Sequence, residues 1–234
     1  MRYLKKYPLM LALSLMLLAY AQSHDLWIEK EQNTFKLLYG HKHSSHGGDA
    51  YMEYKPEFVK SIKCLSNSKI QEINFEKKYP VQIDAKCDIA FVVFSSGYWT
   101  KTVYGTKNVP KDNEKNVIKS WFSEESVKYI DKYTESCEKP MTENLEIVPL
   151  VDVSKLKKGD KIRLQVYYKG KPANNVVVAY GDEPKGSTDE EGKINIRINH
   201  DGFQIISASL SEPADGVKAD EIIYTTSLNF ILGK

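Results

Sequence analysis

The chain has 234 residues, with 33 Lys and Arg against 31 Asp and Glu, and its formal net charge is +2. Three of the basic residues lie in a predicted leader, so the mature chain keeps 30 basic side chains against 31 acidic ones. This balance excludes the strongly basic surface that a nucleic-acid-binding domain needs, and no nucleic acid is expected as a partner.

Residues 1–23 have the layout of a secretory signal peptide. A basic start precedes an apolar run over residues 9–18, which is followed by small residues. The run is too short for a membrane span, which needs roughly 20 apolar residues. Cleavage is expected after Ala21 or after Ser23, and the mature protein is therefore expected in the periplasm.

The residues after the leader predict short strands. Runs at 24–29, 34–39 and 58–64 mix aromatic and β-branched residues and are bounded by turn residues. Residues 81–84 alternate between apolar and polar, and residues 89–94 form a continuous apolar run, which is typical of a strand buried on both faces.

The pattern is less regular between residues 95 and 140. Residues 95–97 predict a turn, and Tyr98-Trp99 predict an aromatic strand whose rings are expected in the core. The remainder is polar and rich in charge. Within it, residues 123–130 predict a short helix with Ser123 as its N-cap and acidic residues in its first turn.

The last part of the chain predicts a separate small β-unit with turns between its strands. The strands are expected at 145–150, 161–168, 176–180, 194–198, 203–208 and 224–232. The acidic stretch Thr188–Gly192 is expected to be a hairpin turn, and His200 is expected in another turn. The sequence therefore predicts an all-β protein, an antiparallel β-sandwich, with domains over 24–140 and 141–234.

Three cysteines, Cys64, Cys87 and Cys137, allow one disulfide and one remaining thiol. An oxidising periplasm favours a bridge. We expect it between Cys64 and Cys87, because both flank strand-like segments of one predicted domain.

Three of the five histidines lie in the stretch GHKHSSHGG at residues 40–48. It opens and closes with glycine and predicts a loop with an adaptable backbone. His41 and His43 project from one face of an extended chain, and a loop can bring His46 back to them at little cost in closure entropy. Such a short His-rich tract predicts a metal site.

Imidazole suits divalent nickel, copper, zinc and cobalt, and the absence of nearby Cys or Met disfavours Cu(I). Asp49 and Glu53 are candidates for an oxygen ligand or for an acceptor that orients a histidine. The ligands themselves do not select one metal, because the affinity order places Cu(II) highest at almost any such site.

His24 lies at the start of the mature chain and is the fourth predicted metal ligand. After cleavage at Ala21 it is the third residue, and the terminal amine, two amides and the imidazole can wrap Cu(II) or Ni(II) in a square plane. After cleavage at Ser23 it is the first residue, and its amine and imidazole form a bidentate pair. Both outcomes make the processed terminus a chelator.

No enzyme is expected, because H-E-x-x-H, G-x-S-x-G and P-loop motifs are absent. Two alternatives to a metal carrier stay open. One is an N-terminal-histidine copper enzyme. The other is a carbohydrate-binding or adhesion sandwich that presents Tyr98, Trp99 and Trp121 and uses no metal.

Several motifs occur together along the mature chain. They are HDLWIE at 24–29, GH at 40–41, GYWTKT at 97–102, LEIVPL at 145–150, GKP at 170–172, TDEEG at 188–192 and YTTSL at 224–228. In this combination the chain resembles the NikK-type periplasmic accessory proteins that are encoded beside energy-coupling-factor nickel and cobalt transporters.

The resemblance implies an Ig-like first half, a transthyretin- or peptidase-regulatory-like second half, and delivery of nickel to an inner-membrane nickel/cobalt transporter. The family's histidine after the leader corresponds to His24, and its Gly-His corresponds to Gly40-His41. His43 and His46 rest on ligand chemistry instead. Ni²⁺ is thus the expected cargo, with Cu²⁺, Co²⁺ and Zn²⁺ as alternatives.

Overall fold

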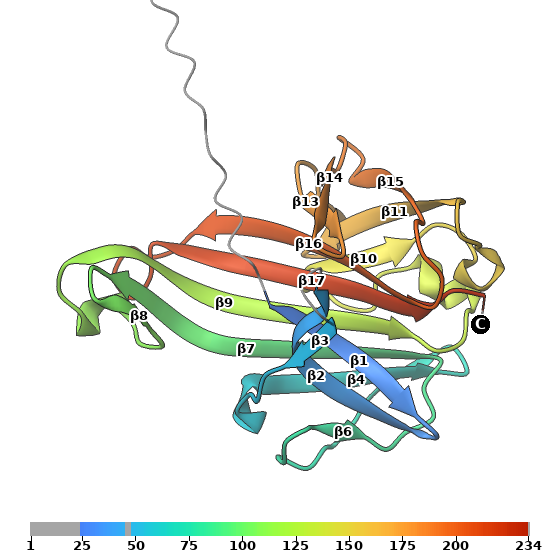
Figure 1. The fold of residues 1–234 in the computed structure, drawn as a ribbon, viewed down its shortest axis with the longest axis horizontal. Coiled ribbons are helices and arrows are strands. Elements are labelled where there is room, and N and C mark those ends of the chain that lie inside the picture. Colours follow the sequence, from blue (N-terminus) through green and yellow to red (C-terminus); the bar gives the residue numbers. More distant parts are fainter. Residues whose placement is uncertain (1–23, 45–47, 234) are drawn as a thin grey trace, which may run out of the picture.

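The computed structural model describes residues 24–44 and 48–233, and within them it holds strands and short 3-10 turns but no α-helix (Figure 1). The predicted leader lies outside these residues. The predicted all-β class is confirmed, with three sheets in a sandwich-like arrangement. No helix in the described part of the chain is long and apolar enough to cross a membrane. The 3-10 turns are η1 (Pro56–Phe58), η2 (Lys111–Asn113), η3 (Glu135–Glu138) and η4 (Val153–Lys155).

A small sheet at the start of the chain carries the histidine stretch. Its strands are β1 (Asp25–Glu31), β2 (Thr34–Ser44), β3 (Gly48–Tyr51) and β6 (Gln82–Ile83), with β2 between β1 and β3. The loop predicted from residue 40 is partly wrong, because β2 runs on through His41 to Ser44. The chain stays extended there because β3 turns back and pairs with it, Gly40 opposite Tyr51 and His41 opposite Ala50.

The central sheet extends through the whole molecule (Figure 1). Its order is β14 (Glu183–Ser187), β13 (Val177–Tyr180), β16 (Phe203–Pro213), β17 (Glu221–Ile231), β9 (Val117–Ile130), β7 (Ile89–Thr102), β4 (Val59–Ser66) and β5 (Lys69–Glu72), with β8 (Gly105–Lys107) on β7. Strands from both sides of residue 140 thus form one sheet. They meet at β9 and β17, the one parallel pair among the described strands.

Two local predictions within this sheet are wrong. Residues 123–130 are strand rather than helix, because β9 lies between β7 and β17, which both hydrogen-bond to it. The side chains accordingly alternate, with Val127 and Tyr129 in one core and Ile130 in the other. The turn predicted at 95–97 is absent as well. Strand β7 continues through it and absorbs the irregularity as a register shift between Phe94 and Gly97.

A second small sheet covers the other face of the central sheet. It consists of β10 (Glu146–Pro149), β11 (Lys161–Tyr168), β12 (Lys171–Pro172) and β15 (Lys193–Arg197). The acidic stretch 188–192 is a turn, as predicted, but it does not close a hairpin. It joins β14 of the central sheet to β15 of this sheet, so the chain changes layer there.

Two apolar cores therefore lie on opposite faces of one sheet. One core packs Leu26, Ile28 and Leu37 of the first small sheet against central-sheet residues such as Val92 and Phe94. The other packs residues of the second small sheet, among them Ile147, Leu164 and Ile196, against Leu228 and Phe230. Burial of these side chains, worth roughly 25 cal/mol per Å², holds the three layers together.

The predicted disulfide is confirmed. Cys64 at the end of β4 is bonded to Cys87, with their Cα atoms 5.3 Å apart, and Cys137 is a free, buried thiol. The bridge ties β4 to the segment that precedes β7.

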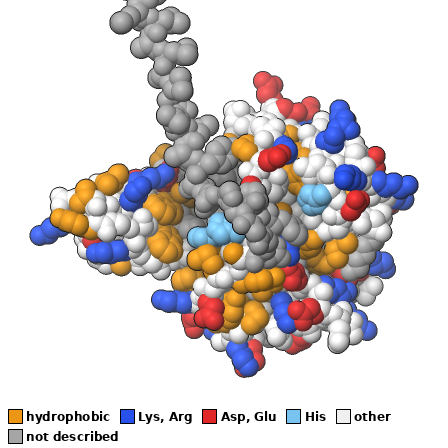
Figure 2. Space-filling view, viewed as in Figure 1, with side chains coloured by type: hydrophobic (Ala, Val, Ile, Leu, Met, Phe, Trp, Pro, Cys, Tyr) orange, Lys and Arg blue, Asp and Glu red, His pale blue; other side chains and the backbone are white. Residues whose placement is uncertain are grey.

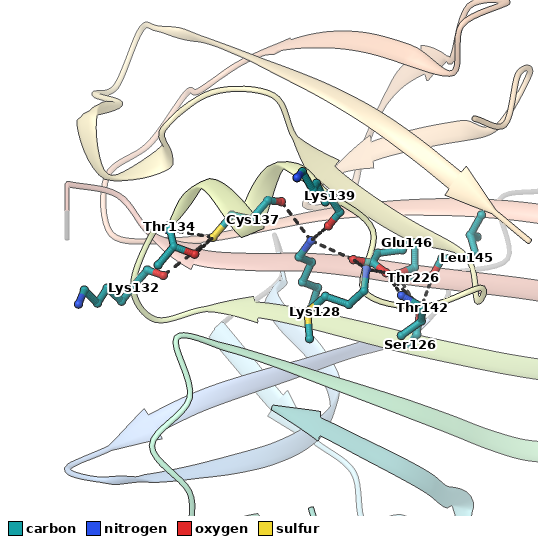
Figure 3. Close-up of polar contacts among 11 residues, drawn as sticks. Ser126, Lys128, Lys132, Thr134, Cys137, Lys139, Thr142, Leu145, Glu146 and Thr226 are labelled. Carbon is teal, nitrogen blue, oxygen red and sulfur yellow. Dashed lines mark hydrogen bonds and ion pairs between the residues drawn. The ribbon is translucent and has the colours of Figure 1, made fainter. Parts of the chain in front are cut away.

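A buried ion pair connects the central sheet to the second small sheet (Figure 3). Lys128 Nζ of β9 lies 2.9 Å from Glu146 Oε1 of β10, and both side chains are fully buried. The ammonium also donates to the Cys137 carbonyl, and the carboxylate accepts N–H bonds from Met141 and Thr142. The pair is fully hydrogen-bonded, which is the condition under which a buried charge pair is tolerated.

Candidate metal centre

Strand register brings His24 and His41 together. In the antiparallel pair β1–β2, Asp25 lies opposite Gly40, so the next pair along the ladder is His24 with His41. Their ring centroids are 4.8 Å apart. Because side chains two positions apart on a strand point to the same face, His24 shares its face with Leu26 and His41 shares its face with Tyr39. Leu26 and Tyr39 both belong to the core beneath the first small sheet. The two histidines predicted from separate stretches of sequence thus form one cluster.

Tyr39 completes this cluster. Its Oη lies 3.3 Å from His24 Nδ1, and the two ring centroids are 5.2 Å apart. The Tyr39 ring also stacks on Phe94 of the central sheet at 5.6 Å, which fixes its position. Sequence reasoning missed this residue, although its spacing of two from His41 on a strand was a usable signal.

Electrostatics favour a neutral imidazole at His24. Partial burial, and secondarily the neighbouring His41, lower the pKa of His24 below its ordinary value of 6.5. A neutral ring is the form that binds a metal. The Tyr39 pKa is raised by burial and by Glu125, so its hydroxyl stays protonated.

Glu125 is a second group that sequence reasoning missed. It lies on β9 with only 7% of its surface exposed, and burial raises its pKa to about 7. Its described hydrogen-bond donor is the Ser123 hydroxyl, 3.3 Å from Oε1. No pattern in the sequence distinguishes this glutamate from the less buried Glu124 beside it, because the burial arises from long-range packing.

The opposite face of β1 and β2 carries a polar cluster that aligns the two strands. Asp25 accepts the Lys42 backbone N–H at 3.1 Å, and Lys42 Nζ lies 2.7 Å from Glu29. Burial raises the pKa of Asp25 to about 6, and Asp182 from the β13–β14 turn contributes in the same direction. This cluster keeps the strand ends paired where the histidines stand.

The other predicted ligands do not join the described cluster. His43 belongs to β2, but its side chain and that of Asp49 lie outside the described residues, as does all of His46. Glu53 is exposed and acts on the pKa of Tyr79 instead. Among the described residues, no group of three or more His, Cys, Asp or Glu side chains is placed to hold a metal ion.

His200 has the turn role that was expected of it. It follows β15, stacks on Tyr180 at 5.2 Å, and its Nδ1 lies 3.0 Å from the Asp201 carbonyl oxygen.

The aromatic residues of the alternative carbohydrate-binding hypothesis are half-buried. Trp99 stacks on Trp121 across β7 and β9 with centroids 6.4 Å apart, and Tyr98 packs against Phe122. In the strand register, Tyr98 and Trp99 lie farther along β7 than Phe94, the residue on which Tyr39 of the histidine cluster stacks.

A sequence profile for a domain of unknown function, DUF4198, matches residues 21–212. The chain belongs to the DUF4198 family. No curated protein and no solved structure matches the chain. The DUF4198 match begins just before His24 and ends within β16, so it includes the His24–His41 pair and most of both cores but not β17.

Proposed function

We propose that this protein binds a divalent transition metal, first of all Ni²⁺, in the periplasm and delivers it to an inner-membrane nickel/cobalt transporter. The periplasmic location rests on the leader at residues 1–23, and the transporter rests on the resemblance to NikK-type accessory proteins. Neither is needed for the binding step, which rests on the site itself.

The observation that carries the proposal is the pairing of His24 with His41 across two strands, with 4.8 Å between their rings. Two imidazoles that face each other across paired strands can supply two of the nitrogen ligands that nickel, copper, zinc and cobalt accept. His43 lies two residues further along β2, and His46 follows in the same stretch, so further nitrogen ligands are close in sequence.

The Tyr39 contact bears on the atom through which His24 would bind. When Nδ1 donates its proton to Tyr39 Oη, the lone pair lies on Nε2, and hydrogen bonding of the other ring nitrogen is the usual arrangement for a metal-bound histidine. Chelation by a processed N-terminus would use Nδ1, the ring nitrogen nearer to the main chain. A metal bound at Nε2 would thus keep the Tyr39 contact, whereas an N-terminal chelate through Nδ1 would break it.

Titration calorimetry on the naturally processed protein tests this proposal. We expect Ni²⁺ affinity tighter than roughly 10 μM, about −7 kcal/mol, and a loss of at least about tenfold in H24A and in H41A. The variant H200A is the matched control, because His200 belongs to a turn outside the cluster.

Two results would contradict the proposal. One is an absence of measurable binding of Ni²⁺, Cu²⁺, Co²⁺ or Zn²⁺ to the processed protein. The other is equal affinity in H24A, H41A and H200A. Sequencing of the mature N-terminus belongs to the same experiment, because it shows whether His24 is the first or the third residue.

A further inference from the structure

A β-arm projects from the molecule beyond both small sheets (Figure 1). We define it as residues 97–123, which comprise the outer half of β7, strand β8 and the first half of β9. In the register, Gly97 lies opposite Ser123 and Thr102 opposite Val117, so the arm is a continuous antiparallel extension of the central sheet. It leads away from the end at which Ile89 pairs with Leu65.

The arm tip exposes large apolar side chains. Val103, Tyr104 and Ile118 have exposed fractions of 64%, 86% and 60%. These residues are neighbours, because Val103 and Tyr104 form the β7–β8 turn, and Ile118 follows Val117, the partner of Thr102. Figure 2 shows apolar side chains on the arm with Lys and Arg side chains at its outline.

The turn is held by two hydrogen bonds, and its residues are unusual for their position. The Thr102 hydroxyl accepts the Tyr104 N–H at 3.1 Å and donates to the Gly105 carbonyl. Two-residue hairpin turns are usually built from Gly, Asn or Asp, and apolar residues there give up favourable turn chemistry. A hydrogen-bonded turn that presents valine and tyrosine to solvent departs from this preference, and such departures are expected at functional positions.

The charge of the arm is positive. Residues 101–119 hold five lysines and two acidic residues. Lys107, Lys111 and Lys119 form ion pairs with Glu114, Asp220 and Glu221. In the described part of the chain, Lys101 and Lys115 are exposed and have no ion-pair partner. Lys101 lies directly opposite Lys119. Like charges in this placement destabilise a strand pair, so the fold itself gives no reason for them.

We propose that the arm tip docks on an anionic lipid bilayer, with Val103, Tyr104 and Ile118 entering the headgroup region and the flanking lysines meeting lipid phosphates. Tyrosine is enriched at membrane–water interfaces, where its ring is buried and its hydroxyl stays wet. Lysines near an anionic surface each contribute attraction that falls off within a Debye length. Charge complementarity thus selects an anionic surface over a zwitterionic one. This inference does not depend on the proposed metal site.

Co-sedimentation of the processed, disulfide-bonded protein with vesicles tests the proposal. We expect binding to vesicles of phosphatidylglycerol and phosphatidylethanolamine, weak binding to phosphatidylcholine, and loss of binding in about 1 M salt, where the Debye length falls to about 3 Å. The variants V103S/Y104S and K101Q/K115Q should each bind at least about tenfold more weakly.

The matched control is K69Q/I70S. Lys69 and Ile70 are exposed on β5, at the opposite end of the sheet, with Ile70 48% exposed. This variant should bind vesicles as the parent does. Circular dichroism and thermal melting of each variant establish that it is folded. Absence of binding to anionic vesicles at low salt, or equal loss in K69Q/I70S, overturns the proposal, and the arm would then be a surface for a protein partner.

Discussion

Gly40 stands where the backbone of β2 leaves no room for a side chain. A Cβ atom there would lie 2.0 Å from the Ala50 carbonyl oxygen of β3, and the φ angle of Gly40 is +141°. The residue separates Tyr39 from His41, the two β2 members of the histidine cluster. A glycine that permits close approach of two strands therefore holds the site in shape.

The variant G40A should be destabilised by about 3 kcal/mol or more, because β2 and β3 must separate to admit the methyl group. Chemical denaturation measures the loss. The matched control is G97A, since Gly97 also has a positive φ, +80°, but an added Cβ would meet nothing within 4 Å. That variant should lose about 1 kcal/mol from backbone strain alone. Equal losses in both would show that Ala50 imposes no constraint.

Glu125 makes stability depend on pH. Its pKa is about 7 in the folded protein against 4.5 for an ordinary glutamate, so the folded state binds the proton more tightly. The resulting stabilisation is complete below about pH 4.5 and is lost as pH rises to about 7, up to about 3 kcal/mol for this group.

The variant E125Q imitates the protonated side chain and should abolish this loss. We expect it to be more stable than the parent by up to about 3 kcal/mol at about pH 8 and nearly equal to it at about pH 4.5. Denaturant titrations at the two pH values measure the difference. An advantage that is the same at both would mean that Glu125 is ionised throughout.

Among the elements, β9 contributes side chains to both cores, as β7 does, and the Lys128–Glu146 pair is its polar connection to β10. Sequence reasoning predicted a helix for its second half because Ser123 and the acidic residues after it fit an N-terminal cap. Local preference was overridden by the strands on either side.

Removal of one partner from the buried pair leaves an uncompensated charge. K128M should therefore lower the free energy of unfolding by about 3–5 kcal/mol, whereas the double variant K128M/E146Q should recover most of that loss. Chemical denaturation measures both. The control is K193M, whose exposed partner Glu191 gives a pair worth less than about 1 kcal/mol. A small loss in K128M would mean that water or a shifted backbone replaces the ammonium.

For the whole molecule, the sequence was sufficient for the β class, for most strand positions and for the Cys64–Cys87 bridge, because alternation, turn residues and cysteine placement are local signals. The sequence was insufficient to predict which strands belong to which layer of the sandwich. The change of sheet at residues 188–192 and the pairing of β9 with β17 depend on contacts between distant segments. The same limit holds for the site, where spacing suggested the histidines but only the strand register identified Tyr39 as their neighbour.

The parallel pair of β9 and β17 has a consequence for how the chain is made. Ser126 and Thr226, which share a hydrogen bond across this pair, are 100 residues apart in sequence. During synthesis β9 emerges long before β17. Until β17 follows, the backbone N–H and C=O groups on that edge of β9 have no strand partner. Such an edge attracts other strands. Pairing of β9 with another strand is thus the specific hazard of folding before β17 has been made.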